Sequence, residues 1–565
     1  MPFCPFVFAA VADELRAAAL GAKVDKINQP EKDRLVLTLR GGDNNRRKNL
    51  KLLLCARPGA ARIHLTEQTF DNPMEPPMFC MLLRKYLTGA RIAAVEQPDY
   101  ERVLTIRFSA SDELGYDRTV SLVFEAAGRV PNIVLIDGEN RILDCLKRAN
   151  VDANAVRPLL PGLYYQLPPT QDGKQNPGAL TDAERLQLFA AGRDPFDALQ
   201  EHLSGLCPLV CRIITANAGG DTAEDLAKAL SDITSQYADR RFTPTLIRDP
   251  AKHGTDFTVV SVPDTMVVER FDTPSEMLDK VYAEREEAEK QATRAGAILR
   301  PVKAARQKLA KKLGLQREEL QRTFQREEYR MKGDILNANL YRIPRGAASV
   351  RLPNFYEENE PEVEIALDVR LSPQKNAQKY YAEYAKLKSA KNHLETIIEQ
   401  GQRELDYLDS TIYAISAADR NALVQIEAEL TEQGYLRSAN SKKNKKAKLP
   451  PLPPLEFTVD GGYTVLVGRT GKQNDELTFH TAGKNDLWFH VKGVPGSHVI
   501  LFSGGEEPSA VAYTQAAELA ASHSSLKGTG KVSVDYTQVR YVKKLPGAMP
   551  GMVTYDRYST AVVDS

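Results

Sequence analysis

Residues 484–501 read Lys-Asn-Asp-Leu-Trp-Phe-His-Val-Lys-Gly-Val-Pro-Gly-Ser-His-Val-Ile-Leu and hold the only Trp of the chain, Trp488. The aromatic and β-branched residues over 487–491 predict a strand, because such side chains fit a pleated surface. The Gly-Val-Pro-Gly sequence over 493–496 predicts a turn, since Gly allows positive φ and Pro fixes φ. A second strand over 497–501 then completes a tight hairpin, in which we expect Trp488 to be buried.

Polar side chains gather at this hairpin, namely Asp486, His490, Ser497 and His498. A metal site is disfavoured because the spacing matches no standard ligand pattern and no Cys lies nearby. A Ser497–His498 nucleophile and base is disfavoured because adjacent residues of a strand point to opposite faces. Two interpretations stay open: the polar groups brace a tight turn, or they belong to a surface that faces nucleic acid.

Length and composition limit the possibilities. A chain of 565 residues predicts three or four domains, and 42% hydrophobic with 26% charged residues is typical of a soluble globular protein. The net charge is +1, so nucleic-acid binding must come from local basic patches. The six Cys all lie within the first 211 residues without a CxxC pair, which indicates reduced thiols in a cytoplasmic protein. No segment reaches ~18 apolar residues, so we expect no membrane association.

The first 172 residues alternate short apolar runs with turn signals, which predicts a β-rich domain. We expect helices over 13–20 and 77–87, and strands over 23–29, 34–40, 50–56, 61–65, 90–96, 102–108, 120–125 and 133–137. Residues 173–250 switch to helical periodicity. Within them, 204–214 resembles the turn and second helix of a helix-hairpin-helix, whose exposed backbone N–H groups can contact phosphate. Simple packing of the two helices is the alternative.

Heptad spacing appears in two long stretches, 274–330 and 376–432. In the second, Lys391 and Gly401 fill the two weak positions of the heptad. The pattern predicts an antiparallel coiled-coil hairpin with arms over 270–332 and 373–435 and a small middle domain over 333–372. Two helices inside a larger bundle are the alternative.

A linker over 436–454 holds five Lys within 441–448 and then a Pro-rich run, and residues 455–565 form the last domain. In that domain we expect a helix over 509–525 and a long strand over 531–544. The strand combines Arg540, Lys543 and Lys544 with Tyr536 and Tyr541, a basic and aromatic mixture typical of RNA binding. An ordinary charged strand is the alternative.

Several separated motifs, in this order along the chain, resemble the NFACT family, which includes the bacterial RqcH proteins and proteins once called fibronectin-binding protein A. The motifs lie at 159–162, 331–336, 376–377, 486–490, 495–499, 516–520, 534–537 and 541–544. The resemblance implies a multidomain α+β protein. Its parts are an NFACT-N domain (1–172) related to the MutM/Fpg glycosylase fold, a helix-hairpin-helix domain (173–250), the coiled coil with its middle domain, and an α+β NFACT-R RNA-binding domain (455–565).

The resemblance also implies a function in ribosome-associated quality control. Family members bind stalled large ribosomal subunits, through rRNA and peptidyl-tRNA, and recruit charged tRNA, chiefly alanyl-tRNA. They thereby direct untemplated C-terminal tailing, such as Ala tailing, of the nascent chain for degradation. The peptidyl-transfer chemistry belongs to the ribosome, so we expect no enzymatic activity, no cofactor and no metal. The sequence leaves open whether a small RNA-binding partner protein takes part.

The site residues follow from the same resemblance. For tRNA binding they are Glu101, Arg102, Glu125, Gly128, Arg129 and Asn132. For ribosome or RNA binding they are Asp486, Trp488, His490, Lys492, Gly496, Ser497, His498, Arg540, Lys543 and Lys544. The chain departs from the family pattern at Glu101-Arg102, where the family has Asp-Arg, and at Phe3-Cys4-Pro5, where it has Phe-Asp-Gly. The choice of tRNA therefore stays open.

Two other functions compete with this one. A fibronectin-binding surface adhesin is suggested by the older family name, but the sequence shows no signal peptide, cell-wall anchor or repeat. A DNA glycosylase could use Pro2 as an N-terminal nucleophile. No Glu follows Pro2, however, and the Cys ligands of a C-terminal zinc finger are absent.

Overall fold

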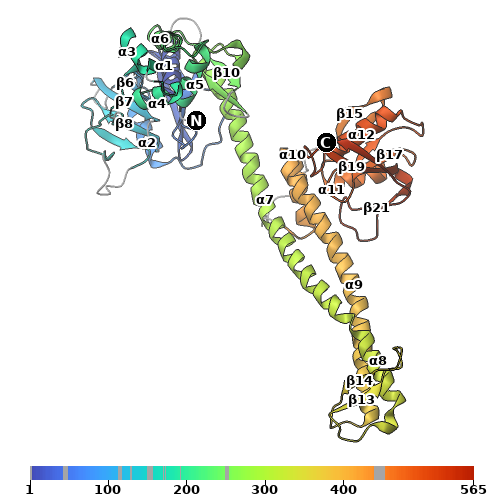
Figure 1. The fold of residues 1–565 in the computed structure, drawn as a ribbon. Helices are drawn as coiled ribbons and strands as arrows, with labels where there is room; N and C mark the ends of the chain where they lie inside the picture. The colour runs from blue at the N-terminus through green and yellow to red at the C-terminus, as the bar shows by residue number, and fades with distance from the viewer. Residues whose placement is uncertain are drawn as a thin grey trace. The chain divides into compact units, whose positions relative to one another are not determined.

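The alternating apolar runs near the N-terminus form one nine-stranded antiparallel sheet, in the order β4-β3-β2-β1-β5-β6-β7-β8-β9. The computed structural model describes residues 3–41, 49–111, 117–126, 130–148, 157–169, 171, 173–190, 192–248, 254–437 and 452–565. It divides into two units, 1–287 and 288–565, which are drawn in Figure 1. The predicted site residues Gly128 and Arg129 and the Lys-rich run over 441–448 lie outside the described residues.

Eight of the nine strands of the large sheet match the predicted stretches within a few residues at each end, and the ninth, over 142–145, has no predicted counterpart. They are β1 (Lys23–Glu31), β2 (Arg34–Arg40), β3 (Asn49–Cys55), β4 (Arg62–Leu65), β5 (Arg91–Glu96), β6 (Val103–Ser111), β7 (Asp117–Glu125), β8 (Asn132–Asp137) and β9 (Ile142–Cys145). Helices α1 (Pro5–Ala19) and α2 (Met78–Leu87) pack their buried residues into the core on the sheet.

The predicted start of the first helix is wrong. Helix α1 begins at Pro5 and not at Asp13, with Pro in the first helical position and Cys4 as the N-cap. Every residue from Pro5 to Ala12 is buried. A helix that is apolar on all sides shows no amphipathic periodicity, so periodicity does not predict the first two turns of α1.

The helical segment that follows shares the core of the sheet. It contains α3 (Asp182–Ala190), α4 (Pro195–His202), α5 (Pro208–Asn217) and α6 (Ala223–Ala238), and then a small sheet of β10 (Thr245–Arg248), β11 (Thr255–Thr258) and β12 (Val267–Arg270). One hydrophobic cluster runs from Phe3 to Tyr282 across the expected boundary at 172/173. Helices α4 and α5 flank the turn over 203–207, and its assignment to the helix-hairpin-helix class stays a prediction.

Two long helices lie side by side in the second unit (Figure 1). Helix α7 (Pro274–Thr323) enters this unit at Ala288 and is followed by α8 (Arg326–Ala338). Two strands, β13 (Ser349–Pro353) and β14 (Glu362–Ala366), separate α8 from α9 (Pro373–Ala417). The pairing is antiparallel, because Arg306 of α7 bonds Asp409 of α9 at 2.8 Å, whereas Gly333 of α8 contacts Tyr381.

Each predicted long helix is interrupted once. The first breaks between Thr323 and Arg326, and the second between Ala417 and Arg420, where α10 (Arg420–Glu432) begins. Asp419 is the N-cap of α10, and its carboxylate accepts the N–H of Ala422 at 2.9 Å. A cap of this kind starts a new helix, while heptad spacing alone continues across the break.

The last domain is a six-stranded antiparallel sheet in the order β15-β16-β18-β17-β19-β22. Its elements are β15 (Leu455–Thr458), β16 (Thr464–Val467), α11 (Gly471–Glu476), β17 (Leu487–Val491), β18 (Val499–Leu501), α12 (Ala510–Ser522), β19 (Lys531–Gln538), β20 (Val542–Lys543), β21 (Thr554–Tyr555) and β22 (Ser559–Asp564). Helix α12 covers one face of this sheet. Over the described residues, no helix is both long and apolar enough to cross a membrane.

Two predicted strands of this domain are too long. The strand expected over 531–544 ends at Gln538, because a turn of 3-10 helix over Val539–Tyr541 carries the chain to a new partner, β21. The strand expected from Ser497 begins at Val499, because the N–H of Ser497 bonds the carbonyl of His523 at 3.0 Å instead of joining the sheet.

Candidate nucleic-acid interface

Three of the predicted tRNA-binding residues lie together at one end of neighbouring strands in the large sheet. Arg102 immediately precedes β6, Glu125 ends β7 and Asn132 begins β8. The strands are neighbours, with Val103 opposite Glu125 and Glu125 opposite Asn132. In antiparallel strands the end of one strand lies beside the start of the next. Residues 30 positions apart in the sequence therefore come together here.

These residues line a cavity of about 1180 Å³ in the first unit. Glu101, Arg102, Glu125 and Asn132 all contribute to its wall, so the structure brings together the four described members of the predicted tRNA set. Sequence reasoning missed four further basic side chains of the wall, which are Lys147, Arg148, Arg157 and Lys174. With five cations against two carboxylates, the cavity favours an anionic ligand.

Glu125 is held by a buried network. Its carboxylate accepts two hydrogen bonds from the Arg157 guanidinium, at 3.0 and 2.6 Å, and one from the Tyr165 hydroxyl at 2.7 Å. The Glu125 side chain is only 4% exposed. Burial and the neighbouring carboxylate raise the pKa of Tyr165, so this hydroxyl stays a donor. Glu125 therefore positions Arg157 at the wall and has little capacity left for a ligand.

The Asn132 side chain also forms hydrogen bonds within the protein. Its amide oxygen accepts the N–H of Lys147 at 3.0 Å, and its amide nitrogen donates to the Lys147 carbonyl at 2.8 Å. The Lys147 ammonium donates to the carbonyls of Pro131, at 3.0 Å, and of Ala56. Burial lowers the pKa of Lys147. The Asn132 side chain thus fixes the loop that carries two basic residues of the wall, Lys147 and Arg148.

Glu101 and Arg102 are half-buried at the cavity, which leaves part of each side chain accessible. Burial raises the pKa of Glu101, although the charge and backbone N–H of Arg102 act in the opposite direction. Within the described part of the chain, the Arg102 guanidinium makes no hydrogen bond and no ion pair within 4 Å. Arg102 is therefore the cation of this wall most available to a ligand.

The turn before Arg102 is fixed by aromatic packing. Tyr100 adopts a positive φ of 56° and stacks on Tyr237 at 4.2 Å, and its N–H donates to the Tyr237 hydroxyl at 3.0 Å. Gly205, in the turn between α4 and α5, lies so close that a Cβ there would be 2.5 Å from the Tyr100 Cβ. The helical segment thus holds the Glu101–Arg102 turn in place.

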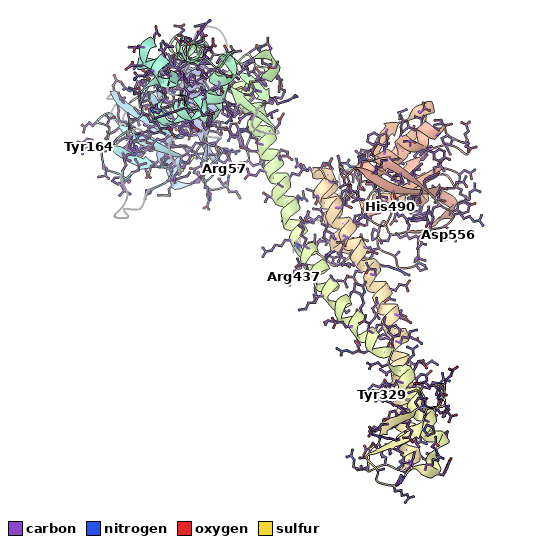
Figure 2. The ribbon with its side chains drawn as sticks, viewed as in Figure 1. Arg57, Tyr164, Tyr329, Arg437, His490 and Asp556 are labelled. Atoms are coloured by element: carbon purple, nitrogen blue, oxygen red, sulfur yellow. The ribbon has the colours of Figure 1, made fainter. Side chains whose placement is uncertain are left out.

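In the second unit the hairpin of β17 and β18 forms as predicted, with Trp488 fully buried. Period-2 alternation along β17 places Phe489 against α12 and Trp488 on the opposite face. The Trp488 and His490 rings stack at 5.6 Å with a 10° interplanar angle. His490, labelled in Figure 2, is half-buried.

Asp486 and His498 lie inside the fold and not on its surface. The Asp486 carboxylate accepts the backbone N–H groups of Gly483, Ser503 and Gly504 at 2.7, 3.0 and 3.0 Å. The His498 ring shares a 2.8 Å hydrogen bond with the Thr478 hydroxyl, and burial lowers its pKa to about 3. Asp486 and His498, buried and already hydrogen-bonded, brace the hairpin, and the buried Trp488 ring packs on the rings of His490 and His498.

The metal and nucleophile interpretations gain no support. No group of three His, Cys, Asp or Glu side chains that could hold a metal occurs among the described residues. The His490 and His498 rings meet edge to face at 5.7 Å, and the Asp486 carboxylate is occupied by backbone amides. Ser497 and Gly496 instead connect the hairpin to the end of α12, through the carbonyl of His523 and a bridge to Ser524.

The basic side chains of the predicted RNA surface are exposed. Lys492 lies 3.6 Å from the Asp535 carboxylate and over the Tyr558 ring, and Arg540 donates to the Asn485 side chain at 2.7 Å. The remaining two, Lys543 and Lys544, pair with Asp556 and Asp475. Lys543 and Asp556 are both exposed, and an exposed ion pair of this kind is weak, so Lys543 can exchange its partner for phosphate.

Comparisons with known proteins cover nearly the whole chain. The sequence profile described as NFACT N-terminal and middle domains matches residues 5–449, and the profile described as NFACT protein RNA binding domain matches 454–555. The Rqc2 homolog RqcH of Bacillus subtilis (strain 168) is 35% identical over 553 residues, which are 97% of this chain and 95% of the relative. The Rqc2 homolog RqcH of Streptococcus pneumoniae (strain D39) is 34% identical over 562 residues, 99% of this chain and 97% of the relative.

Solved structures match the two halves separately. The C-terminal part of the fibronectin/fibrinogen-binding protein from Streptococcus suis is 32% identical, with a TM-score of 0.39, and the match covers 48% of this chain and 94% of that one. The N-terminal part of the same protein is 28% identical, with a TM-score of 0.42, over 50% and 99% of the two chains. On the profiles and the near full-length relatives together, this chain belongs to the NFACT family.

Proposed function

We propose that this protein is a ribosome-associated quality control factor. It binds stalled large ribosomal subunits that carry peptidyl-tRNA and recruits a charged tRNA to direct untemplated C-terminal tailing of the nascent chain. The observation that carries the proposal is the similarity to curated RqcH proteins over both units, 97% of this chain and 95% of the relative. The match spans both units and includes the residues 454–555 that match the RNA-binding domain.

The cavity of the first unit supports a role in tRNA recruitment. Its excess of basic side chains suits a phosphate backbone, and its half-buried Glu101 and Arg102 suit contacts to base edges. The chemistry we assign to this protein is binding and positioning alone, with peptide-bond formation left to the ribosome. Alanyl-tRNA is the proposed tRNA, in line with the family, and the cytoplasm is the proposed location.

Sedimentation through a density gradient tests ribosome binding. We expect the protein to travel with large subunits that carry peptidyl-tRNA and to leave them as the salt concentration rises, because phosphate contacts release counterions. Protein that stays at the top of the gradient at low salt contradicts the proposal. Cell fractionation in parallel separates the adhesin alternative, for which the protein should be on the cell surface and absent from the subunits.

A matched pair of variants tests tRNA recruitment. Arg102→Ala removes the cation of the cavity without an internal partner and should abolish tailing while subunit binding persists. Arg107→Ala is the control, because Arg107 lies on the same strand, β6, pairs with Glu96 at 2.9 Å and is outside the cavity. Equal tailing by both variants contradicts the assignment of Arg102.

A further inference from the structure

A second cavity, of about 500 Å³, lies in the second unit between helices α9 and α10 and the face of the C-terminal sheet opposite α12. On the helical side the wall is formed by small side chains, which leave room for a ligand. They include Ala414, Ala418 and Ala422. The turn over 493–497 and the segment over 550–553 close its ends. The volume falls in the range of small-molecule sites, which is roughly 300–1,000 Å³.

Aromatic rings form the opposite wall. The Trp488 ring is fully buried and packs on His490, on His498 at 5.2 Å and on Tyr555 at 4.8 Å. His490 and Tyr555 are only half-buried and contribute to the cavity wall, so part of each ring remains accessible. A rigid wall of rings suits a flat aromatic ligand, because stacking gains energy without ordering flexible side chains.

The charged groups of the cavity disfavour an anionic ligand. Its one Arg, Arg469, is paired with Asp419 at 2.5 Å, and Asp409 is paired with Arg306 at 2.8 Å, while Asp406 and Glu429 are the other acidic side chains of the wall. A phosphate is therefore repelled. The Trp488 indole N–H is buried and has no hydrogen-bond partner among the described residues, which leaves a donor for a ligand acceptor.

Cations lie just outside this cavity. The Lys492 ammonium is 3.6 Å from the Asp535 carboxylate, which also accepts the Tyr555 hydroxyl at 2.9 Å, and Tyr555 lines the cavity. Exposed Lys543 lies opposite Thr554 on the adjacent strand, next to Tyr555. Lysines beside the cavity, paired with Asp535 and Asp556, and no unpaired cation in its lining are the arrangement expected for a nucleotide whose base enters and whose phosphate stays out.

We propose that this cavity binds a single unpaired nucleobase of RNA, which enters between the α9–α10 helices and the Trp488–His490 wall while Lys492 and Lys543 contact the flanking phosphates. The inference rests on the proposed function, since it takes the ligand to be RNA. It is supported by the position of the ring wall and both lysines within residues 454–555, which match the RNA binding domain.

The only Trp of the chain reports directly on this site, so the test is intrinsic fluorescence of the full-length protein. The four nucleosides, a single-stranded RNA and a duplex of the same sequence are titrated separately. We expect a saturable change of Trp488 emission with nucleosides and with single-stranded RNA. The single strand should bind more tightly at low salt, since it adds phosphate contacts, and the duplex should leave the emission unchanged because its bases are paired.

Two variants confirm the location. Ala414→Leu fills the cavity from α9 and should weaken the response about tenfold or more, as loss of a stacked base does. Ala390→Leu is the control, with the same substitution on the same helix at another half-buried Ala that does not line the cavity. His490→Ala should weaken the response as well and covers the case in which Ala414→Leu fails to fold.

The outcomes separate this inference from the proposed function. No saturable change with any nucleoside or single strand, or an equal change in Ala414→Leu and Ala390→Leu, overturns the base-binding cavity even if the protein sediments with large subunits. Binding of nucleosides without single-stranded RNA overturns RNA as the source of the base. A response to single-stranded RNA from a protein that never joins large subunits supports the cavity and contradicts the ribosomal role.

Discussion

The Arg157 guanidinium donates two hydrogen bonds to the Glu125 carboxylate, at 3.0 and 2.6 Å, in the wall of the N-terminal cavity. Both side chains are largely buried, with 15% and 4% of their area exposed. Family resemblance alone assigns Glu125 to tRNA contact. In the structure the carboxylate is saturated by Arg157 and Tyr165, so its effect on a ligand must pass through the position of Arg157.

Glu125→Ala should therefore destabilise the first unit by about 3–5 kcal/mol, because it leaves the Arg157 charge buried without a partner. Arg102→Ala should cost under about 0.5 kcal/mol, since Arg102 has no internal partner to lose. Thermal unfolding of the two variants measures the difference. If Glu125→Ala unfolds like the unaltered protein yet loses tRNA, the carboxylate contacts tRNA directly and the positioning role is wrong.

Gly205→Ala tests the support of the Glu101–Arg102 turn. A Cβ at Gly205 would meet the Tyr100 Cβ at 2.5 Å and its carbonyl oxygen at 2.7 Å, so the turn must move. Gly219→Ala is a matched control, because Gly219 has nearly the same φ, +71° against +70°, with no atom within 4 Å. Both substitutions carry the cost of a positive φ, about 1–2 kcal/mol. Only Gly205→Ala should also reduce tRNA binding, and an equal loss in Gly219→Ala would contradict this account.

Acid should destabilise the C-terminal domain through His498. Burial lowers the pKa of His498 to about 3, against about 6.5 in an unfolded chain. Between these values the unfolded state binds the proton and the folded state does not, so stability falls by ~1.4 kcal/mol for each pH unit below about 6.5. Urea unfolding followed by Trp488 emission measures the slope. His498→Gln should have a slope shallower by that amount, and an identical slope would show that His498 is protonated in the fold.

Gly401 tests the packing of the two helical arms. The heptad pattern marks it only as a weak position. A Cβ at Gly401 would lie 2.7 Å from a methyl carbon of Leu313 on α7, so this Gly forms the socket for a buried Leu. Gly401→Ala should overpack the arms and cost about 1–3 kcal/mol, less the gain in helix propensity. Gly314→Ala, with no atom within 4 Å, should instead stabilise by up to ~1 kcal/mol. Stabilisation by both substitutions would contradict the packing.

The sequence predicts local elements well where the pattern is periodic and poorly where tertiary contacts decide. Strands β1 to β8 of the first sheet follow from alternation, but the start of α1 does not, because its first turns are buried on all sides. The interruption at Asp419 depends on a cap, and the end of β19 depends on a change of partner from β17 to β21. Neither is visible in hydrophobic periodicity.

The candidate sites divide in the same way. The motif around Glu101–Arg102 locates the N-terminal cavity. Arg157 and Lys174 also line its wall, because the chain after the sheet returns to the same strand ends. In the C-terminal domain the motif residues Asp486, Trp488 and His498 are those that build the hairpin, while the cavity beside them needs α9 and α10, which are distant in sequence. A motif identifies residues that matter without saying which of them reach the surface.

The most direct test of the proposed role in ribosome quality control is the identity of the RNA bound by this protein in cells. The protein is cross-linked, purified under denaturing conditions, and its RNA is sequenced, with Arg102→Ala and Arg107→Ala processed alongside. We expect large-subunit rRNA together with tRNA for the unaltered protein and for Arg107→Ala, and rRNA without tRNA for Arg102→Ala. Recovery of neither rRNA nor tRNA above the background of a mock purification would contradict this role.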